Sequence, residues 1–125
     1  MSEVRSFFED YGDAFTKGAT VIATFYGEPC ITARGGNVRV NATRKDCEAF
    51  FATVDRTYRE RGFRSGRMLS FAEQSVGANS ALATIAWAYD DSRGKTLWES
   101  TFTYTLYRFG REWKILLQVM HDDAS

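Results

Sequence analysis

The sequence contains one histidine, His121, and histidine is the side chain that most often transfers protons in enzymes. It follows a run of apolar residues, so we expect it at the end of the last strand, facing solvent. Proton transfer requires a hydrogen bond to the substrate, and His121 reaches one only if the C-terminus folds over the mouth of a pocket. His121 is therefore a conditional candidate for a catalytic residue.

The spacing of the other reactive residues gives little support to other kinds of site. His121, Asp122 and Asp123 are adjacent and do not easily converge on one metal ion, and no second histidine or cysteine pair stands at ligand spacing. A Gly-x-Ser-x-Gly nucleophile turn does not occur in the sequence. Gly35-Gly36 falls at a predicted hairpin tip rather than between a strand and a helix, where a phosphate loop would lie. We expect neither a metal nor a cofactor.

A run of arginines has two interpretations. Its members are Arg56, Arg59, Arg61, Arg64 and Arg67. They form either a patch for phosphate or nucleic acid, or the cationic end of a helix followed by a solvated strand. The chain has 16 basic and 16 acidic residues, and this balance favours the second interpretation. We therefore expect no nucleic-acid partner and no membrane partner.

Length and composition indicate one globular domain spanning residues 1–125, because the sequence is 44% hydrophobic and 26% charged. No apolar stretch approaches the roughly 18 residues that span a bilayer, and the first residues do not resemble a secretion signal. We expect a cytoplasmic protein in which Cys30 and Cys47 are free thiols.

Apolar residues recur at helical spacing in three segments. The first stripe is Val4, Phe7, Phe8, Tyr11 and Phe15. Ser2 can cap this helix and Gly18 can end it. A short second helix is expected next, with an apolar face of Val21, Ile22 and Phe25. The third and longest helix should begin with a capping box at Thr43 and Asp46 and end at Gly62.

The remaining segments predict strands. Residues 30–34 and 38–41 alternate around Gly35-Gly36, which is typical of a hairpin. Four longer strands follow, at Arg64–Glu73, Ala81–Tyr89, Leu97–Phe109 and Trp113–His121. Short turns between them make strands that are neighbours in the chain antiparallel. The predicted fold class is therefore α+β.

The strand Leu97–Phe109 has two different faces, because side chains alternate across a strand. One face carries Trp98, Ser100, Phe102, Tyr104 and Leu106. The other face carries Glu99, Thr101, Thr103, Thr105 and Tyr107. The aromatic face should point inward.

Three stretches resemble the nuclear transport factor 2-like superfamily, with its SnoaL-like polyketide cyclase and ketosteroid isomerase branches. They are the first two helices through Phe25-Tyr26, the hairpin leading into Thr43-Arg44-Lys45-Asp46, and residues 107–115. The resemblance covers nearly the whole chain. It implies a cystatin-like α+β fold, a cone-shaped barrel in which the sheet curls around the long helix and encloses an apolar pocket. The expected lining is Tyr11, Phe15, Phe51, Trp87, Trp98, Phe102, Tyr104 and Leu117.

The resemblance also supplies candidate catalytic residues. In the isomerase branch a tyrosine on the first helix donates a hydrogen bond to a developing oxyanion, and Tyr11 holds the matching place. The aspartate base of that branch falls near Arg34 and its protonated acid falls at Phe102, so isomerase chemistry of that kind is not expected. Tyr11, Tyr104 and His121 remain the candidates.

Two functions follow from the resemblance. The first is a SnoaL-like protein whose pocket binds a small apolar or aromatic ligand, with lyase, isomerase or hydrolase activity left open. The alternative is a non-catalytic binding or assembly module that uses the outer face of its sheet. In relatives this face commonly pairs two subunits, so we expect a homodimer through Thr101, Thr103 and Thr105.

Overall fold

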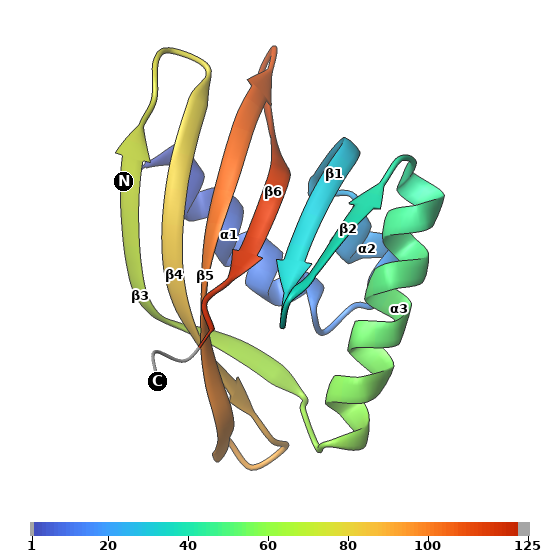
Figure 1. The fold of residues 1–125 in the computed structure, drawn as a ribbon. Coiled ribbons are helices and arrows are strands. Elements are labelled where there is room, and N and C mark those ends of the chain that lie inside the picture. Colours follow the sequence, from blue (N-terminus) through green and yellow to red (C-terminus); the bar gives the residue numbers. More distant parts are fainter. Residues whose placement is uncertain (1, 123–125) are drawn as a thin grey trace.

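The computed structural model describes residues 2–122. Within them the chain forms three helices and six strands (Figure 1). In chain order these are α1 (Glu3–Ala14), α2 (Ala19–Ala23), β1 (Tyr26–Arg34), β2 (Asn37–Asn41), α3 (Arg44–Glu60), β3 (Ser65–Ser75), β4 (Ser80–Asp90), β5 (Thr96–Phe109) and β6 (Glu112–Met120). The mixed α+β class predicted from the sequence is confirmed. None of these helices has the length and apolar character needed to cross a membrane.

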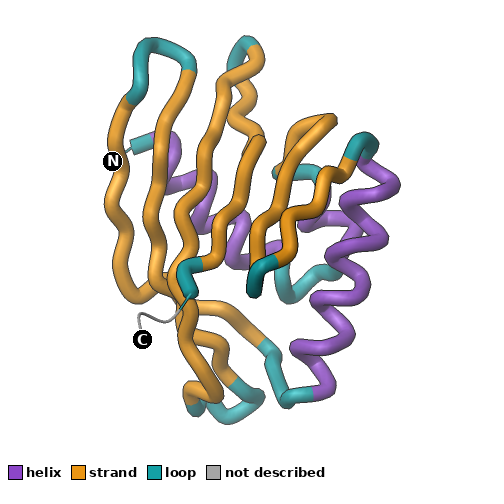
Figure 2. Tube along the Cα trace, viewed as in Figure 1, coloured by secondary structure: helices purple, strands orange, loops and turns teal. Residues whose placement is uncertain are grey.

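The strands form one curved sheet in the order β2-β1-β6-β5-β4-β3. Consecutive strands within the hairpin and within β3 to β6 pair antiparallel as predicted, whereas β1 pairs with β6 in parallel. The sheet is open rather than a closed cone-shaped barrel, because β2 and β3 are its two edges and do not pair with each other. Figures 1 and 2 show that α3 lies beside β2. The helix therefore stands at the edge that would have to pair with β3 to close the sheet.

The helix ends follow the capping residues. The Ser2 hydroxyl accepts a hydrogen bond from the Arg5 amide at 2.9 Å, and the Thr43 hydroxyl accepts one from the Asp46 amide at 3.2 Å, as predicted. Glu28 of β1 adds a cap that the sequence did not reveal, since its carboxylate accepts the Arg44 amide at 2.8 Å. Two side chains therefore cap the start of α3, and the one from Glu28 also connects the helix to the sheet.

The hairpin turn depends on two glycines. Gly35 and Gly36 have φ values of 54° and 81°, which L residues with side chains rarely adopt. The first strand of the hairpin begins at Tyr26, earlier than predicted, and includes Pro29. Pairing with β2 starts only at Cys30, so no β2 carbonyl needs the amide hydrogen that proline lacks.

A bulge in β6 sets which of its side chains face the helices. Thr105 pairs with Leu117 and Leu106 pairs with Ile115, which leaves Leu116 as an extra residue. Ile115 and Gln118 are consequently both buried. Leu117 takes the outer face together with its partner Thr105, so its expected place in the pocket lining is wrong.

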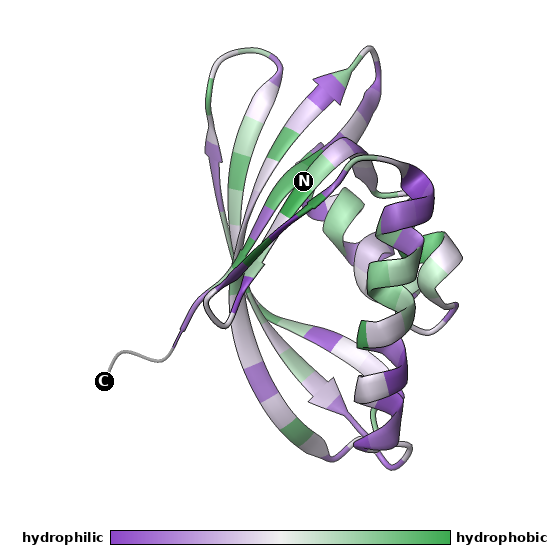
Figure 3. Cartoon of the chain, turned by 45° about the vertical axis from the view of Figure 1, so that its right-hand side comes forward, coloured by the Kyte–Doolittle hydropathy of each residue, from purple (hydrophilic) through white to green (hydrophobic). Residues whose placement is uncertain are grey.

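The helices cover the concave face of the sheet, where hydrophobic residues gather (Figure 3). Phe102, Tyr104 and Leu106 of β5 are buried on this face, as the alternation predicted. The core is rich in rings, and its fully buried aromatic residues are Phe8, Tyr11, Tyr26, Phe51, Phe63, Phe102 and Tyr104. Each such ring contributes about 1.5–3 kcal/mol by leaving water. The outer face carries the half-buried Thr101, Thr103 and Thr105.

Candidate functional site

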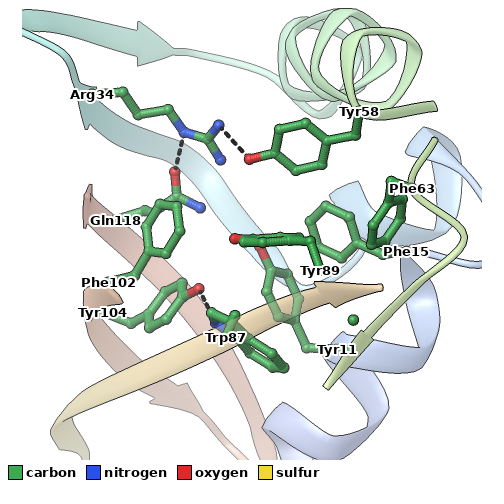
Figure 4. Close-up of a pocket in the computed structure, with 12 residues that line it drawn as sticks. Tyr11, Phe15, Arg34, Tyr58, Phe63, Trp87, Tyr89, Phe102, Tyr104 and Gln118 are labelled. Carbon is green, nitrogen blue, oxygen red and sulfur yellow. Dashed lines mark hydrogen bonds between the residues drawn. The ribbon is translucent and has the colours of Figure 1, made fainter. Parts of the chain in front are cut away.

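A small cavity lies between the concave face of the sheet and the helices α1 and α3 (Figure 4). Its volume of about 20 Å³ leaves room for about one water molecule. The residues lining it are Tyr11, Gly12, Phe15, Arg34, Tyr58, Phe63, Gly66, Trp87, Tyr89, Phe102, Tyr104 and Gln118. Most of them are aromatic, and the lining contains no carboxylate and no histidine.

The structure brings most of the expected lining together. Tyr11, Phe15, Trp87, Phe102 and Tyr104 all face the cavity. Of the remaining residues, Phe51 is fully buried behind the cavity, with its ring centroid 4.9 Å from that of Tyr26. Trp98 lines a neighbouring surface depression, and Leu117 lies on the opposite face of the sheet.

A chain of side-chain hydrogen bonds crosses the wall of the cavity. The hydroxyls of Tyr11 and Tyr26 lie 2.6 Å apart. Gln118 Nε2 donates to the Tyr26 hydroxyl at 2.8 Å, and Gln118 Oε1 accepts from Arg34 Nε at 3.0 Å. Arg34 Nη1 donates to the Tyr58 hydroxyl at 3.2 Å. The network thus connects α1, β1, β6 and α3 through side chains alone.

The buried tyrosines can act as hydrogen-bond donors rather than bases. Burial raises the pKa of Tyr11, Tyr26 and Tyr104 well above the usual value, because a phenolate would lose its hydration. All three hydroxyls therefore stay protonated at neutral pH. Tyr104 accepts a hydrogen bond from Trp87 Nε1 at 3.0 Å.

Arg34 is the only charged side chain in the lining of the cavity. Its guanidinium carbon lies 5.4 Å from the ring centroid of Phe50 and 5.2 Å from that of Phe102. Among residues 2–122 it forms no ion pair, and its nitrogen Nη2 has no hydrogen-bond partner. Figure 4 shows that this nitrogen points into the space between Tyr58 and Tyr89.

An open depression of about 680 Å³ adjoins the cavity. Arg34 and Tyr58 line both spaces and therefore separate one from the other. The depression is also bordered by Arg61, whose guanidinium carbon lies 3.8 Å from the centroid of the Trp98 ring. Trp98 in turn stacks on Tyr89 at 4.8 Å, which links the wall of the depression to the wall of the cavity.

The three candidate catalytic residues do not converge. Tyr11 and Tyr104 both line the cavity and pack edge to face, with ring centroids 5.9 Å apart. His121 lies on the rim of the depression, and its Nε2 is 2.7 Å from the Thr103 hydroxyl on the outer face. Asp122 lies on the same rim, whereas Asp123 is outside the described residues. Cys30 and Cys47 are buried free thiols behind the site, with sulfurs 4.0 Å apart.

Comparison with known proteins identifies the family. A family model described as NTF2-like protein (DUF6841) matches residues 2–123. The chain belongs to this NTF2-like family. The resemblance seen in the sequence is thereby confirmed at the level of family and fold. No curated protein matches the sequence.

Solved structures share the fold of this NTF2-like domain at low sequence identity. A cystatin-like protein of unknown function from Nostoc punctiforme has a TM-score of 0.79 at 10% identity, with 98% of this chain and 90% of that chain covered. Aln2 from a Streptomyces species has a TM-score of 0.78 at 12% identity, covering 97% and 89%. A calcium/calmodulin dependent protein kinase II association domain from Xanthomonas campestris has a TM-score of 0.72 at 16% identity, covering 98% and 88%. At such identities the likeness shows the fold alone.

Sequence reasoning missed the two polar residues that organise the cavity of this NTF2-like domain. Arg34 follows Cys30 and Thr32 at alternate positions of β1, so the period of the strand was a signal that it faces inward. Gln118 gave no such signal, because the bulge at Leu116 reverses the alternation just before it.

Proposed function

We propose that this NTF2-like domain binds a small aromatic molecule at the boundary between the cavity and the depression. The observation that carries the proposal is that Arg34 and Tyr58 line both a ring-lined cavity and an open space of about 680 Å³, which lies in the range of ligand pockets. The closed cavity is too small for an organic ligand. Entry therefore requires Tyr58 to turn away, so that the ligand lies partly in each space.

Binding without turnover fits the lining better than catalysis does. Lyase, isomerase and hydrolase reactions of small molecules need a group that takes a proton. Among residues 2–122, the polar side chains of the cavity lining are neutral phenols, an indole N–H, an amide and a guanidinium, and His121 lies on the outer rim. We therefore assign Tyr11 and Tyr104 to ligand contact through their rings and hydroxyl hydrogens.

The test is a binding titration with a neutral probe, 2-naphthol, followed by nuclear magnetic resonance of the ¹⁵N-labelled protein. The expected result is a saturable shift of the Trp87 indole signal, because its Nε1–H borders the cavity. Trp113 of β6 provides an internal control. It lines a separate depression beside the start of α1 and the end of β3, and it lines neither of the two spaces of the site. The proposal fails if no signal saturates at millimolar probe, or if only Trp113 responds.

A second function, assembly of two copies through the outer sheet face, is favoured by the strand register. Two rows of paired residues cross this face without a charge. One row is Val40, Ile31, Leu117 and Thr105, and the other is Val38, Ala33, Val119 and Thr103. Val38 is 73% exposed and Val40 is 63% exposed, so covering the face would remove apolar surface from water.

We propose that a second copy of the chain covers this face at Thr101, Thr103 and Thr105. Light scattering should then give twice the 14.2 kDa mass of one chain. A Thr103→Arg variant should return the single-chain mass, because it buries a charge at the centre of the contact. Thr57→Arg on the exposed side of α3 is the matched control and should leave the mass unchanged. A single-chain mass for the unmodified protein at micromolar concentration would contradict the proposal.

A further inference from the structure

Two other partly buried arginines, Arg59 and Arg67, have acidic partners, whereas Arg34 has none. Arg59 Nε lies 3.1 Å from the Asp55 carboxylate, and Arg67 Nε lies 3.1 Å from that of Asp90. Arg34 is half-buried among aromatic rings, and its partners are the neutral Gln118 and Tyr58. A cation in such surroundings loses hydration that neutral partners replace only in part. The charge of Arg34 is therefore not paired by direct contact with any acidic side chain in residues 2–122.

The arrangement leaves one edge of the guanidinium for a ligand. Nε is used by Gln118, and the nearby rings of Phe50 and Phe102 restrict approach to the flat faces of the group. The edge formed by Nη1 and Nη2 points toward Tyr58 and Tyr89 (Figure 4), and Arg34 lines both the cavity and the depression. A carboxylate matches this edge, because its two oxygens accept the two parallel N–H bonds of a guanidinium.

In the closed site Tyr58 covers part of this edge, because its hydroxyl accepts a hydrogen bond from Arg34 Nη1. When Tyr58 turns away to admit a ligand, this bond opens. A carboxylate oxygen then takes the place of the Tyr58 hydroxyl on Nη1. Among residues 2–122, Arg34 is the one charged residue that lines both the cavity and the depression, whose wall also carries Arg61, Glu99 and Asp122. At the boundary between the two spaces a single guanidinium therefore suits a single carboxylate.

We propose that Arg34 recognises the carboxylate of an aromatic monocarboxylic acid, and that this acid is the class of ligand which the domain binds. The inference rests on the proposed function, since it names the chemistry of the molecule in the same site. The aromatic part of the ligand lies against the rings of the cavity, and its carboxylate lies on the Nη edge of Arg34. Arg34 is thus a specificity-determining residue.

The experiment compares 2-naphthoate with 2-naphthol, which share a ring system and differ in charge at neutral pH. Calorimetric titration of the unmodified protein should give at least about tenfold tighter binding of 2-naphthoate, as expected for a charge-assisted pair of hydrogen bonds. Arg34→Gln should remove this preference and leave the affinity for 2-naphthol unchanged. Arg39→Gln is the matched control: Arg39 also lies near Phe50, at 5.5 Å from the ring centroid, but does not line the cavity.

The outcomes separate the two proposals. If the unmodified protein binds both probes equally, or if Arg34→Gln keeps the preference for 2-naphthoate, the carboxylate inference is wrong while ligand binding stands. If neither probe binds, the proposed function fails and the inference fails with it. Should Arg34→Gln not fold, the side-chain ¹⁵N signals of the unmodified protein decide: 2-naphthoate must shift the Arg34 Nε signal, and 2-naphthol must not. An unchanged Arg34 signal at saturating 2-naphthoate would overturn the inference.

Discussion

Arg34 Nε and Gln118 Oε1 lie 3.0 Å apart, although 84 residues separate them in the sequence. The amide of Gln118 is fixed by this bond at its oxygen and by the bond to the Tyr26 hydroxyl at its nitrogen. An amide held at both ends orients the guanidinium, so the direction of the free Arg34 edge depends on β6 as much as on β1.

Removing this amide should destabilise the fold. Gln118→Leu leaves the Tyr26 hydroxyl and Arg34 Nε without their partner in a buried place, which costs about 1–3 kcal/mol. Urea denaturation should show this decrease in the free energy of unfolding. Gln74→Leu, the same change at an exposed position of β3, should shift it by less than about 0.5 kcal/mol. Equal effects of the two substitutions would show that the Gln118 network adds nothing to stability.

Adding a charge at the same position should change ligand binding. Gln118→Glu places a carboxylate 3.0 Å from Arg34 Nε and supplies the acidic partner that this arginine lacks. The affinity for 2-naphthoate should fall about tenfold, because Arg34 is then paired with an acid of the protein that also repels the ligand carboxylate. The affinity for 2-naphthol should be the same as in the unmodified protein, so this neutral probe is the control in the same titration. A variant that binds 2-naphthoate as tightly as the unmodified protein would speak against charge recognition.

The buried tyrosines predict a loss of stability at high pH. Tyr11, Tyr26 and Tyr104 have pKa values raised by burial in the folded protein, whereas in the unfolded chain they ionise near pH 10. The free energy of unfolding is therefore unaffected by the ionisation of these groups below about pH 10. It decreases as the pH rises further, because the unfolded state then binds fewer protons than the folded state. Chemical denaturation across this range, with tyrosinate absorbance as a second signal, measures the decrease.

The same experiment on Tyr11→Phe provides the control for the alkaline effect. This variant lacks one of the raised pKa values, so its stability should fall less steeply above about pH 10. It also loses the 2.6 Å bond to Tyr26 and should be less stable at neutral pH. Identical slopes for the variant and the unmodified protein would exclude Tyr11 as a source of the pH dependence.

Asp90 predicts a loss of stability at low pH. Hydrogen bonds from Arg67, and further the bond from Thr96, lower the pKa of its carboxyl below the usual value, against the opposing effect of burial. The stabilisation is present above the unfolded pKa of about 3.9 and is lost as the pH falls through the lower folded value. Asp90→Asn should therefore be less stable than the unmodified protein at pH 7, by less than about 1 kcal/mol because Arg67 is half exposed.

The difference in stability between Asp90→Asn and the unmodified protein should become smaller as the pH is lowered below about 4. Thermal unfolding at a series of pH values measures it. The control is Asp91→Asn, in the turn directly after Asp90. It tests whether removing any acid of this region causes the same pH-dependent loss of stability. A difference that stays constant down to the lowest pH would show that the Asp90 carboxylate is not the titrating group.

Local patterns in the sequence were sufficient for the helices and for the faces of β5. Ser2 and Thr43 cap the helices where their side chains can reach free amides, and the alternation of Phe102, Tyr104 and Leu106 places them in the core. Both are properties of a few consecutive residues. The parallel pairing of β1 with β6 has no local signal, because it depends on how distant segments meet. The open sheet and the position of Gln118 could not be predicted for the same reason.

The candidate site shows the same division. Tyr11, Phe15, Trp87, Phe102 and Tyr104 were expected in the lining because large rings on inward faces must gather where helices cover the sheet. Their packing density was not predictable, and the cavity they leave is only about 20 Å³. Arg34 has no acidic partner among residues 2–122, and no stretch of sequence around residue 34 can reveal which side chains it meets in space.

The parallel pair of β1 and β6 also orders events during synthesis of the chain. Tyr26 pairs with Ile115, so β1 has no second neighbour until β6 has been synthesised. On the ribosome, the hairpin and α3 emerge first, when β1 is paired with β2 on one side and has no strand on the other. Contacts between such distant segments form late and slow the folding reaction. Emergence of β6 from the ribosome is therefore the step that allows the two parts of the sheet to join.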